Sequence, residues 1–190
     1  VMPAEDLAYK AVWTPNIYQI SLDPNGGNVV EGDLATRTIT FGEAYGSLPV
    51  MEKENYTFEG WYTDKTGGGK LTETSAVELG HDHVIYAQYK PIEFTITYYG
   101  TEDAQNDNPE TYNVETGLFS LEKASRRGYT FEGWYDNENL EGEEVRAVSA
   151  NETGNKTFYA KWRENHYKIV YHSNEGKGYS KEQQLAYTEI

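Results

Sequence analysis

Short stretches of the chain alternate apolar and polar residues, the pattern of strands with one buried face. The first stretch places Tyr18, Ile20 and Leu22 on one face, with polar residues between them. Residues 94–98 and 167–171 repeat this arrangement. No segment keeps a 3.6-residue period, so little helix is expected. The pattern predicts a mostly β fold, at most an α+β fold with little helix, in small mixed sheets.

A second strand is predicted where threonines alternate with larger apolar residues. We expect Ile39 and Phe41 to face inward, and Tyr112 and Val114 to take the same positions in the next copy.

A closing strand alternates in the same way and occurs at residues 85–89 and, 73 positions later, at 158–162. Its period of two predicts that Tyr89 and Trp162 face the core. Tyr86 and Tyr159 then face outward. These two outward tyrosines are the candidate interaction surface.

The seven residues Tyr56–Tyr62 recur unchanged as Tyr129–Tyr135, which shows that the chain is a tandem array. Because Phe58 and Trp61 are three residues apart, a regular strand would put them on opposite faces. A β-bulge at residues 59–60 and 132–133, where glycine accepts a positive φ, would return both rings to the core. The predicted structural core is aromatic: Phe58, Trp61, Tyr89, Phe131, Trp134 and Trp162.

The repeats divide the chain into four predicted parts. They are residues 1–16, the closing strand of a preceding partial repeat; 17–91, repeat 1; 92–164, repeat 2; and 165–190, the first half of a further, truncated repeat. Only four residues separate each closing strand from the next opening strand, and two of these junctions contain proline. Such short, stiff junctions favour beads in an elongated rod. We expect a monomer with end-to-end contacts, cut from a longer protein.

Several motifs together resemble the Listeria–Bacteroides repeat, the B-repeat of internalin B. Repeat 1 carries Asn-Gly-Gly at 25–27 and Tyr-Gly-Ser-Leu-Pro at 45–49, and both repeats carry the tryptophan heptapeptide. Repeat 2 departs from the pattern, with Gly-Thr-Glu-Asp at 100–103 in place of Asn-Gly-Gly. The resemblance implies a β-grasp-like stalk or interaction module of extracellular proteins, mainly from Gram-positive bacteria, without catalytic residues.

Charge and composition narrow the possible partners. Sixteen Lys and Arg against 31 Asp and Glu give a net charge of −15, which argues against nucleic acid and against an electrostatic membrane anchor. The chain has no cysteine, so disulfides and thiol chemistry are excluded. No apolar run is long enough to insert into a membrane.

The candidate metal and cofactor sites are weak, and we expect neither a metal nor a cofactor. His81 and His83 could form a metal pair, but no copy occurs 73 residues later. The acidic residues of loop 102–110 lack the spacing of a calcium-binding EF-hand loop. Solvated side chains are the favoured interpretation of both groups.

The candidate catalytic residues are equally weak, and we expect that the protein is not an enzyme. Glu143 and Glu144 are adjacent, but nothing places them in a cleft. Trp61 and Trp134 could stack on sugars, yet a repeated tryptophan within a strand is more typical of a core residue. A Lys–Asn cross-link could use Lys10, Lys90 or Lys161 as the amine, but strand parity puts Lys10 and Lys161 on the outward face, and the cross-link is disfavoured.

The sequence therefore favours a non-enzymatic repeat segment of a bacterial cell-surface protein, located outside the cell at the cell wall. Its function would be that of a stalk or spacer and adhesion module. The alternative is a module that binds glycan or host protein through its outward aromatics. The partner would be a cell-wall or host glycan or protein.

Overall fold

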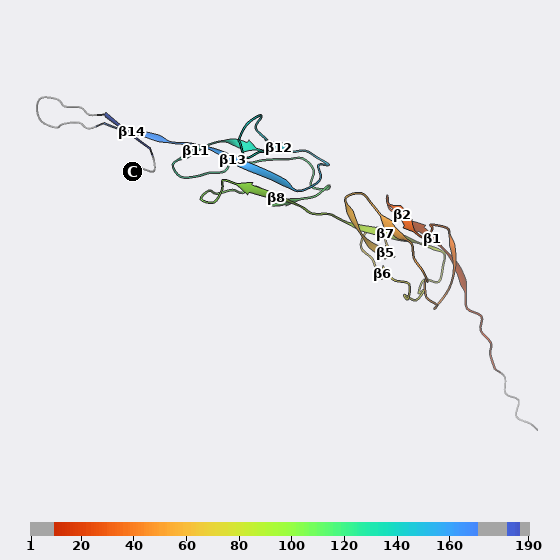
Figure 1. Cartoon of the computed structure of the whole chain (residues 1–190). Helices are drawn as coiled ribbons and strands as arrows, with labels where there is room; N and C mark the ends of the chain where they lie inside the picture. The colour runs from red at the N-terminus through yellow and green to blue at the C-terminus, as the bar shows by residue number, and fades with distance from the viewer. Residues whose placement is uncertain (1–9, 171–181, 187–190) are drawn as a thin grey trace, which may run out of the picture. The chain divides into compact units, whose positions relative to one another are not determined.

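A computed structural model describes residues 10–170 and 182–186 (Figure 1). Throughout these residues the chain forms strands, turns and bridges, and it forms no helix. The prediction of a mostly β protein in several small sheets is confirmed. The chain divides into two compact units between Lys90 and Pro91, and each has its own hydrophobic core.

Repeat 1, in the first unit, contains one five-stranded sheet and one two-stranded sheet. Its described strands are β1 (Ile17–Asp23), β2 (Asn28–Glu31), β3 (Arg37–Thr40), β4 (Val50–Glu52), β5 (Tyr56–Tyr62), β6 (Lys70–Leu71) and β7 (His83–Pro91). The larger sheet has the order β3-β1-β7-β5-β6, and β2 pairs with β4 outside it. Strand β1 runs antiparallel to β3 and parallel to β7.

Repeat 2, in the second unit, repeats the central part of this sheet. Its described strands are β8 (Phe94–Tyr99), β9 (Thr111–Tyr112), β10 (Phe119–Ser120), β11 (Tyr129–Tyr135), β12 (Ala147–Val148) and β13 (Lys156–Glu164). The main sheet has the order β11-β13-β8-β9, with β8 parallel to β13. Strands β14 (His166–Val170) and β15 (Glu182–Ala186) form a separate two-stranded antiparallel sheet.

The two repeats share one topology, in which the opening strand lies between an antiparallel second strand and a parallel closing strand. A parallel pair requires a long crossover connection, which is usually helical. Here the described residues of both crossovers form turns, bridges and short strands. The β-grasp likeness and the rod arrangement stay predictions.

The predicted bulge is confirmed in repeat 2. Phe131 pairs with Trp162 and Gly133 with Lys161, so Glu132 is the extra residue on β11. Gly133 has φ of 144°, and Gly60 has φ of 128° at the same place in repeat 1. Because of the extra residue, Phe131 and Trp134 enter the same core, with ring centroids 5.2 Å apart.

The inward placement of Phe41 was wrong. Strand β3 ends at Thr40, and a turn follows in which the Glu43 N–H donates to the Thr40 carbonyl. The Phe41 side chain is 47% exposed as a result. Alternation beyond Thr40 therefore did not mean a continuing strand.

The described part of the predicted closing strand in residues 1–16 forms no strand. Residues 10–16 are without strand pairing, and Val12 and Trp13 are 89% and 88% exposed. Residues 1–9 lie outside the described residues. The assignment of this stretch to a preceding repeat stays a prediction.

Candidate functional site

Trp61 and Trp134, the first candidates for a sugar platform, are enclosed in the two cores. Their side chains are 2% and 1% exposed. The Trp61 indole N–H donates to the Pro49 carbonyl at 2.8 Å, and the Trp134 indole N–H donates to the Glu122 carbonyl at 2.8 Å. An indole that is buried and satisfied has no ring face to offer a ligand. Both residues are structural.

The aromatic residues of the closing strands also hold the core together. The Tyr89 hydroxyl donates to the Pro24 carbonyl at 2.9 Å, and the Trp162 indole N–H donates to the Gly100 carbonyl at 2.8 Å. Each bond ties the closing strand to the turn that follows the opening strand. Burial, assisted by the charge of Asp23, raises the pKa of Tyr89.

Tyr159 lies in a row of three tyrosines on the outward face of repeat 2. On β13 it is in register with Tyr99 of β8 and Tyr135 of β11. The Tyr99 and Tyr159 rings stack with centroids 5.1 Å apart and planes 17° from parallel. The Lys161 ammonium lies 5.0 Å from the Tyr135 ring centroid. The row is thus an aromatic strip beside a cation.

Tyr86, the corresponding residue of repeat 1, has different surroundings. It is half-buried and lies in register with Asp23 where Tyr159 has Tyr99. The structure therefore does not give the two candidate tyrosines equivalent sites. Sequence reasoning missed Tyr99, because strand parity gives its face but only the parallel register gives its neighbour.

The histidine pair is tied into repeat 1. His83 Nε2 lies 2.9 Å from the Tyr45 hydroxyl, while His81 is exposed. The two imidazole centroids are 6.0 Å apart at nearly right angles. Within the described residues no three histidines or carboxylates converge as a metal site would require.

Glu144, one of the two adjacent glutamates, lies near Glu132, but these two residues lack the arrangement of a catalytic acid and base. Glu144 and Glu132 both line a cavity of about 400 Å³ beside Trp134. Glu144 forms an ion pair with Arg146 at 3.0 Å, and Glu132 with Arg163 at 2.9 Å. The arrangement therefore lacks the isolated carboxyl in apolar surroundings that acid catalysis uses.

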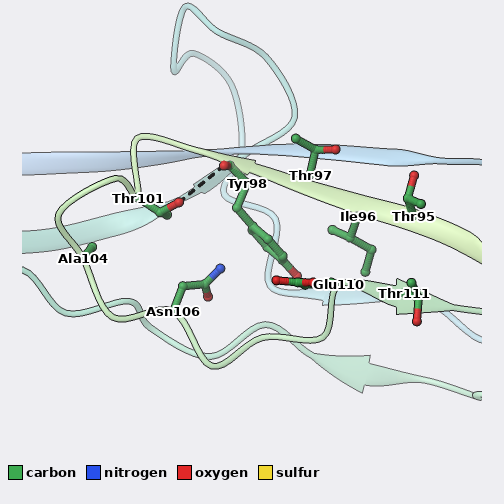
Figure 2. Close-up of a pocket in the computed structure, with 9 residues that line it drawn as sticks. All are labelled: Thr95, Ile96, Thr97, Tyr98, Thr101, Ala104, Asn106, Glu110 and Thr111. Atoms are coloured by element: carbon green, nitrogen blue, oxygen red, sulfur yellow. Dashed lines mark hydrogen bonds between the residues drawn. The ribbon is translucent and has the colours of Figure 1, made fainter.

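A cavity of about 530 Å³ lies along β8 in repeat 2. Figure 2 shows β8 on one side and the loop that bears Thr101, Ala104 and Asn106 on the other. The cavity is lined by Thr95, Ile96, Thr97, Tyr98, Thr101, Ala104, Asn106, Glu110 and Thr111. Its lining holds one carboxylate, that of Glu110, while the Thr95 and Thr97 side chains project from the opposite side of β8 (Figure 2).

Tyr98 forms a fixed wall of this cavity. Its hydroxyl donates to the Pro109 carbonyl at 3.0 Å, and its ring centroid lies 5.0 Å from that of Trp134. Burial, with a smaller contribution from the negative charge of Glu110, raises the pKa of Tyr98 to about 12. The phenol therefore stays a neutral hydrogen-bond donor at physiological pH.

Comparison with known proteins places these repeats in a family. Residues 18–88 and 94–161 each match the Listeria-Bacteroides repeat domain, and the chain belongs to this repeat family. A protein named as a Gly-rich membrane protein, from Evansella cellulosilytica, is 30% identical over 186 residues, 93% of this chain and 20% of that protein. Internalin H of Listeria monocytogenes is 31% identical over 139 residues, 72% of this chain and 24% of that protein.

The chain thus spans a quarter or less of the length of these relatives. Within the described residues, no helix is long and apolar enough to cross a membrane.

Proposed function

We propose that the chain is a spacer segment of a bacterial cell-surface protein and that it has no enzymatic activity. Each repeat would add a fixed length and hold other parts of the protein away from the cell wall. Such a segment would act outside the cell. The mechanism is geometric, because stability and length in an array arise repeat by repeat.

The proposal is carried by one observation, the recurrence of a separate aromatic core in each repeat. One core surrounds Trp61 and the other Trp134. In each, the indole binds a carbonyl twelve residues upstream, and the closing aromatic binds the turn after the opening strand. A spacer is expected to repeat one scaffold, whereas an enzyme needs only one active site, so the repeated core favours a spacer. The names of the relatives, a membrane protein and Internalin H, support a surface location.

The test is to vary the number of repeats on a cell surface. The chain is displayed on a Gram-positive bacterium with a terminal epitope, as it stands and with residues 17–164 duplicated. We expect the duplicated form to raise the epitope above the wall by a constant additional distance, measured by super-resolution microscopy. An epitope height that does not change with repeat number would contradict the spacer function.

Adhesion is the second candidate, and the stacked pair of Tyr99 and Tyr159 favours it. An aromatic strip beside a cation suits a cell-wall or host glycan, or a host protein. The substitution Tyr159→Ser should then weaken binding to a glycan array or to host-cell extracts. The substitution Tyr86→Ser should weaken this binding less, because Tyr86 lies beside Asp23 and not beside a second tyrosine. Equal and strong binding by the wild type and both variants would remove these tyrosines from the adhesion surface.

A further inference from the structure

The two repeats differ in the connection between the first two strands of their sheets. In repeat 1 this connection covers residues 24–36, and its Leu34 packs against the core. In repeat 2 it covers residues 100–110 and is two residues shorter. The cavity of about 530 Å³ lies against this shorter connection.

In repeat 1, the corresponding edge of the sheet holds the side chain of Arg37. Arg37 of β3 is in register with Ile20 of β1. Its guanidinium donates to the Ser47 carbonyl and, at 3.2 Å, to the Asp33 carbonyl. The Asp33 carboxylate lies 3.8 Å away. An extended segment of repeat 1 therefore lies along the opening strand, with its cation held by oxygen atoms.

Repeat 2 has the opposite charge at the same place. The Ile96 N–H donates to the Glu110 carbonyl at 2.7 Å, so Glu110 occupies the position that Arg37 holds in repeat 1. The Glu110 side chain lines the cavity beside the end of the Tyr98 ring (Figure 2). Among the described residues, no ion pair to Glu110 is found.

The far wall of the cavity is held in place by the rest of repeat 2. Asn108 is 7% exposed, and its side-chain amide donates to the Glu122 carbonyl at 2.9 Å. It also accepts from the Glu122 N–H at 2.6 Å. Gln105 and Ser125 exchange two backbone hydrogen bonds of 2.9 Å. The loop is thus pinned on both sides of Asn106, and the cavity is preformed.

We propose that this cavity binds the Lys or Arg side chain of an extended peptide segment from a partner protein. The cation would lie against the Glu110 carboxylate, as Arg37 lies against Asp33 in repeat 1. The peptide would run along the edge of β8 opposite β13, which β9 leaves unpaired from Thr97 onward within the described residues. On this edge the Tyr98 carbonyl already accepts from the Thr101 hydroxyl at 3.3 Å, so the peptide would add mainly through its side chain. Addition of an extended peptide to an open strand is a recurrent recognition mode.

Charge favours a cationic peptide over a neutral sugar. The loop around the cavity carries Glu102, Asp103 and Asp107 as well as Glu110, and only Asp103 has a described ion pair, with Arg126 at 3.6 Å. Opposite charge across an interface speeds encounter and excludes anionic partners. This site is distinct from the tyrosine row, and its occupation does not depend on whether the repeats act as a spacer.

The test is an NMR titration of the isotopically labelled chain with the peptide acetyl-Gly-Thr-Arg-Thr-Gly-amide. We expect saturable shifts of the amide signals of Tyr98, Thr101 and Asn106. A peptide with citrulline in place of arginine has the same shape without the charge and should bind at least about tenfold more weakly, as expected for loss of a charged hydrogen bond. Added salt should weaken binding of the arginine peptide.

Two variants of equal net charge locate the site. Glu110→Gln should weaken binding of the arginine peptide about tenfold, and Glu31→Gln, on the exposed strand β2 of repeat 1, should leave it unchanged. An unchanged Trp134 indole N–H signal checks that repeat 2 keeps its fold. Absence of saturable shifts at millimolar peptide, or equal binding of the citrulline peptide, would overturn the proposal. The same shifts produced by N-acetylglucosamine would assign the cavity to a sugar and overturn it too.

Discussion

Replacing Trp61 with alanine tests the claim that each repeat folds around its own tryptophan. Trp61 is 2% exposed, and truncation of a buried tryptophan costs about 3–5 kcal/mol. The Pro49 carbonyl loses its indole donor, which adds about 1–3 kcal/mol if no water replaces it. A domain of this size has a total stability of about 4–11 kcal/mol. Repeat 1 should therefore be largely unfolded at 37 °C in the Trp61→Ala variant.

Differential scanning calorimetry measures the outcome directly. We expect the variant to lose about half of the unfolding enthalpy, because enthalpy scales with the number of residues that unfold. The remaining transition should keep the midpoint of repeat 2. Trp134→Ala is the reciprocal variant and should leave the transition of repeat 1. Trp61→Phe keeps a six-membered ring in the core but removes the N–H donor and the rest of the indole, so its cost should be smaller than that of Trp61→Ala.

A different calorimetric result would refute this reasoning. If Trp61→Ala lowered the midpoint of a single transition that included both repeats, the folding unit would be the pair and not the repeat. A loss below about 1 kcal/mol would show that the core closes around the missing indole, contrary to the usual cost of such a cavity.

Two further predictions concern the turn of repeat 1 and the cavity of repeat 2. Gly27→Ala should destabilise repeat 1 by about 1–3 kcal/mol in denaturant unfolding, because the new methyl group would overlap the Tyr89 hydroxyl and lie 2.7 Å from the Glu52 carbonyl; no change would mean that the closing strand can shift. Since the folded pKa of Tyr98 is raised from 10.0 to about 12, its contribution to stability is complete below pH 10 and is lost as the pH rises towards 12. The melting temperature should thus fall between pH 10 and 12, and it should fall less steeply in Tyr98→Phe.

Much of the fold could be predicted from the sequence because the same pattern of strands occurs in both repeats. Alternation gave the opening and closing strands, and the three-residue spacing of Phe131 and Trp134 required the bulge that the structure contains. The error at Phe41 has a physical cause. Alternation continues past Thr40, but Gly42, with φ of 83°, bends the chain away from the sheet.

The candidate site was less accessible to sequence reasoning. The row of Tyr99, Tyr159 and Tyr135 depends on the register of three strands, one of them parallel, which no local pattern encodes. The cavity beside Tyr98 lies against the loop of repeat 2, which is two residues shorter than the corresponding loop of repeat 1. The replacement of Asn-Gly-Gly signalled a changed loop, but the cavity beside it could be found only from the packing.

Small-angle X-ray scattering of the chain tests the spacer account most directly. A compact globule of 190 residues would have a radius of gyration of about 16 Å. Repeats joined by short stiff junctions should give a value well above this, and a distance distribution with a second maximum from pairs of atoms in different repeats. A radius near 16 Å with a single symmetric maximum would mean that the repeats pack into one globule, and it would contradict the spacer account.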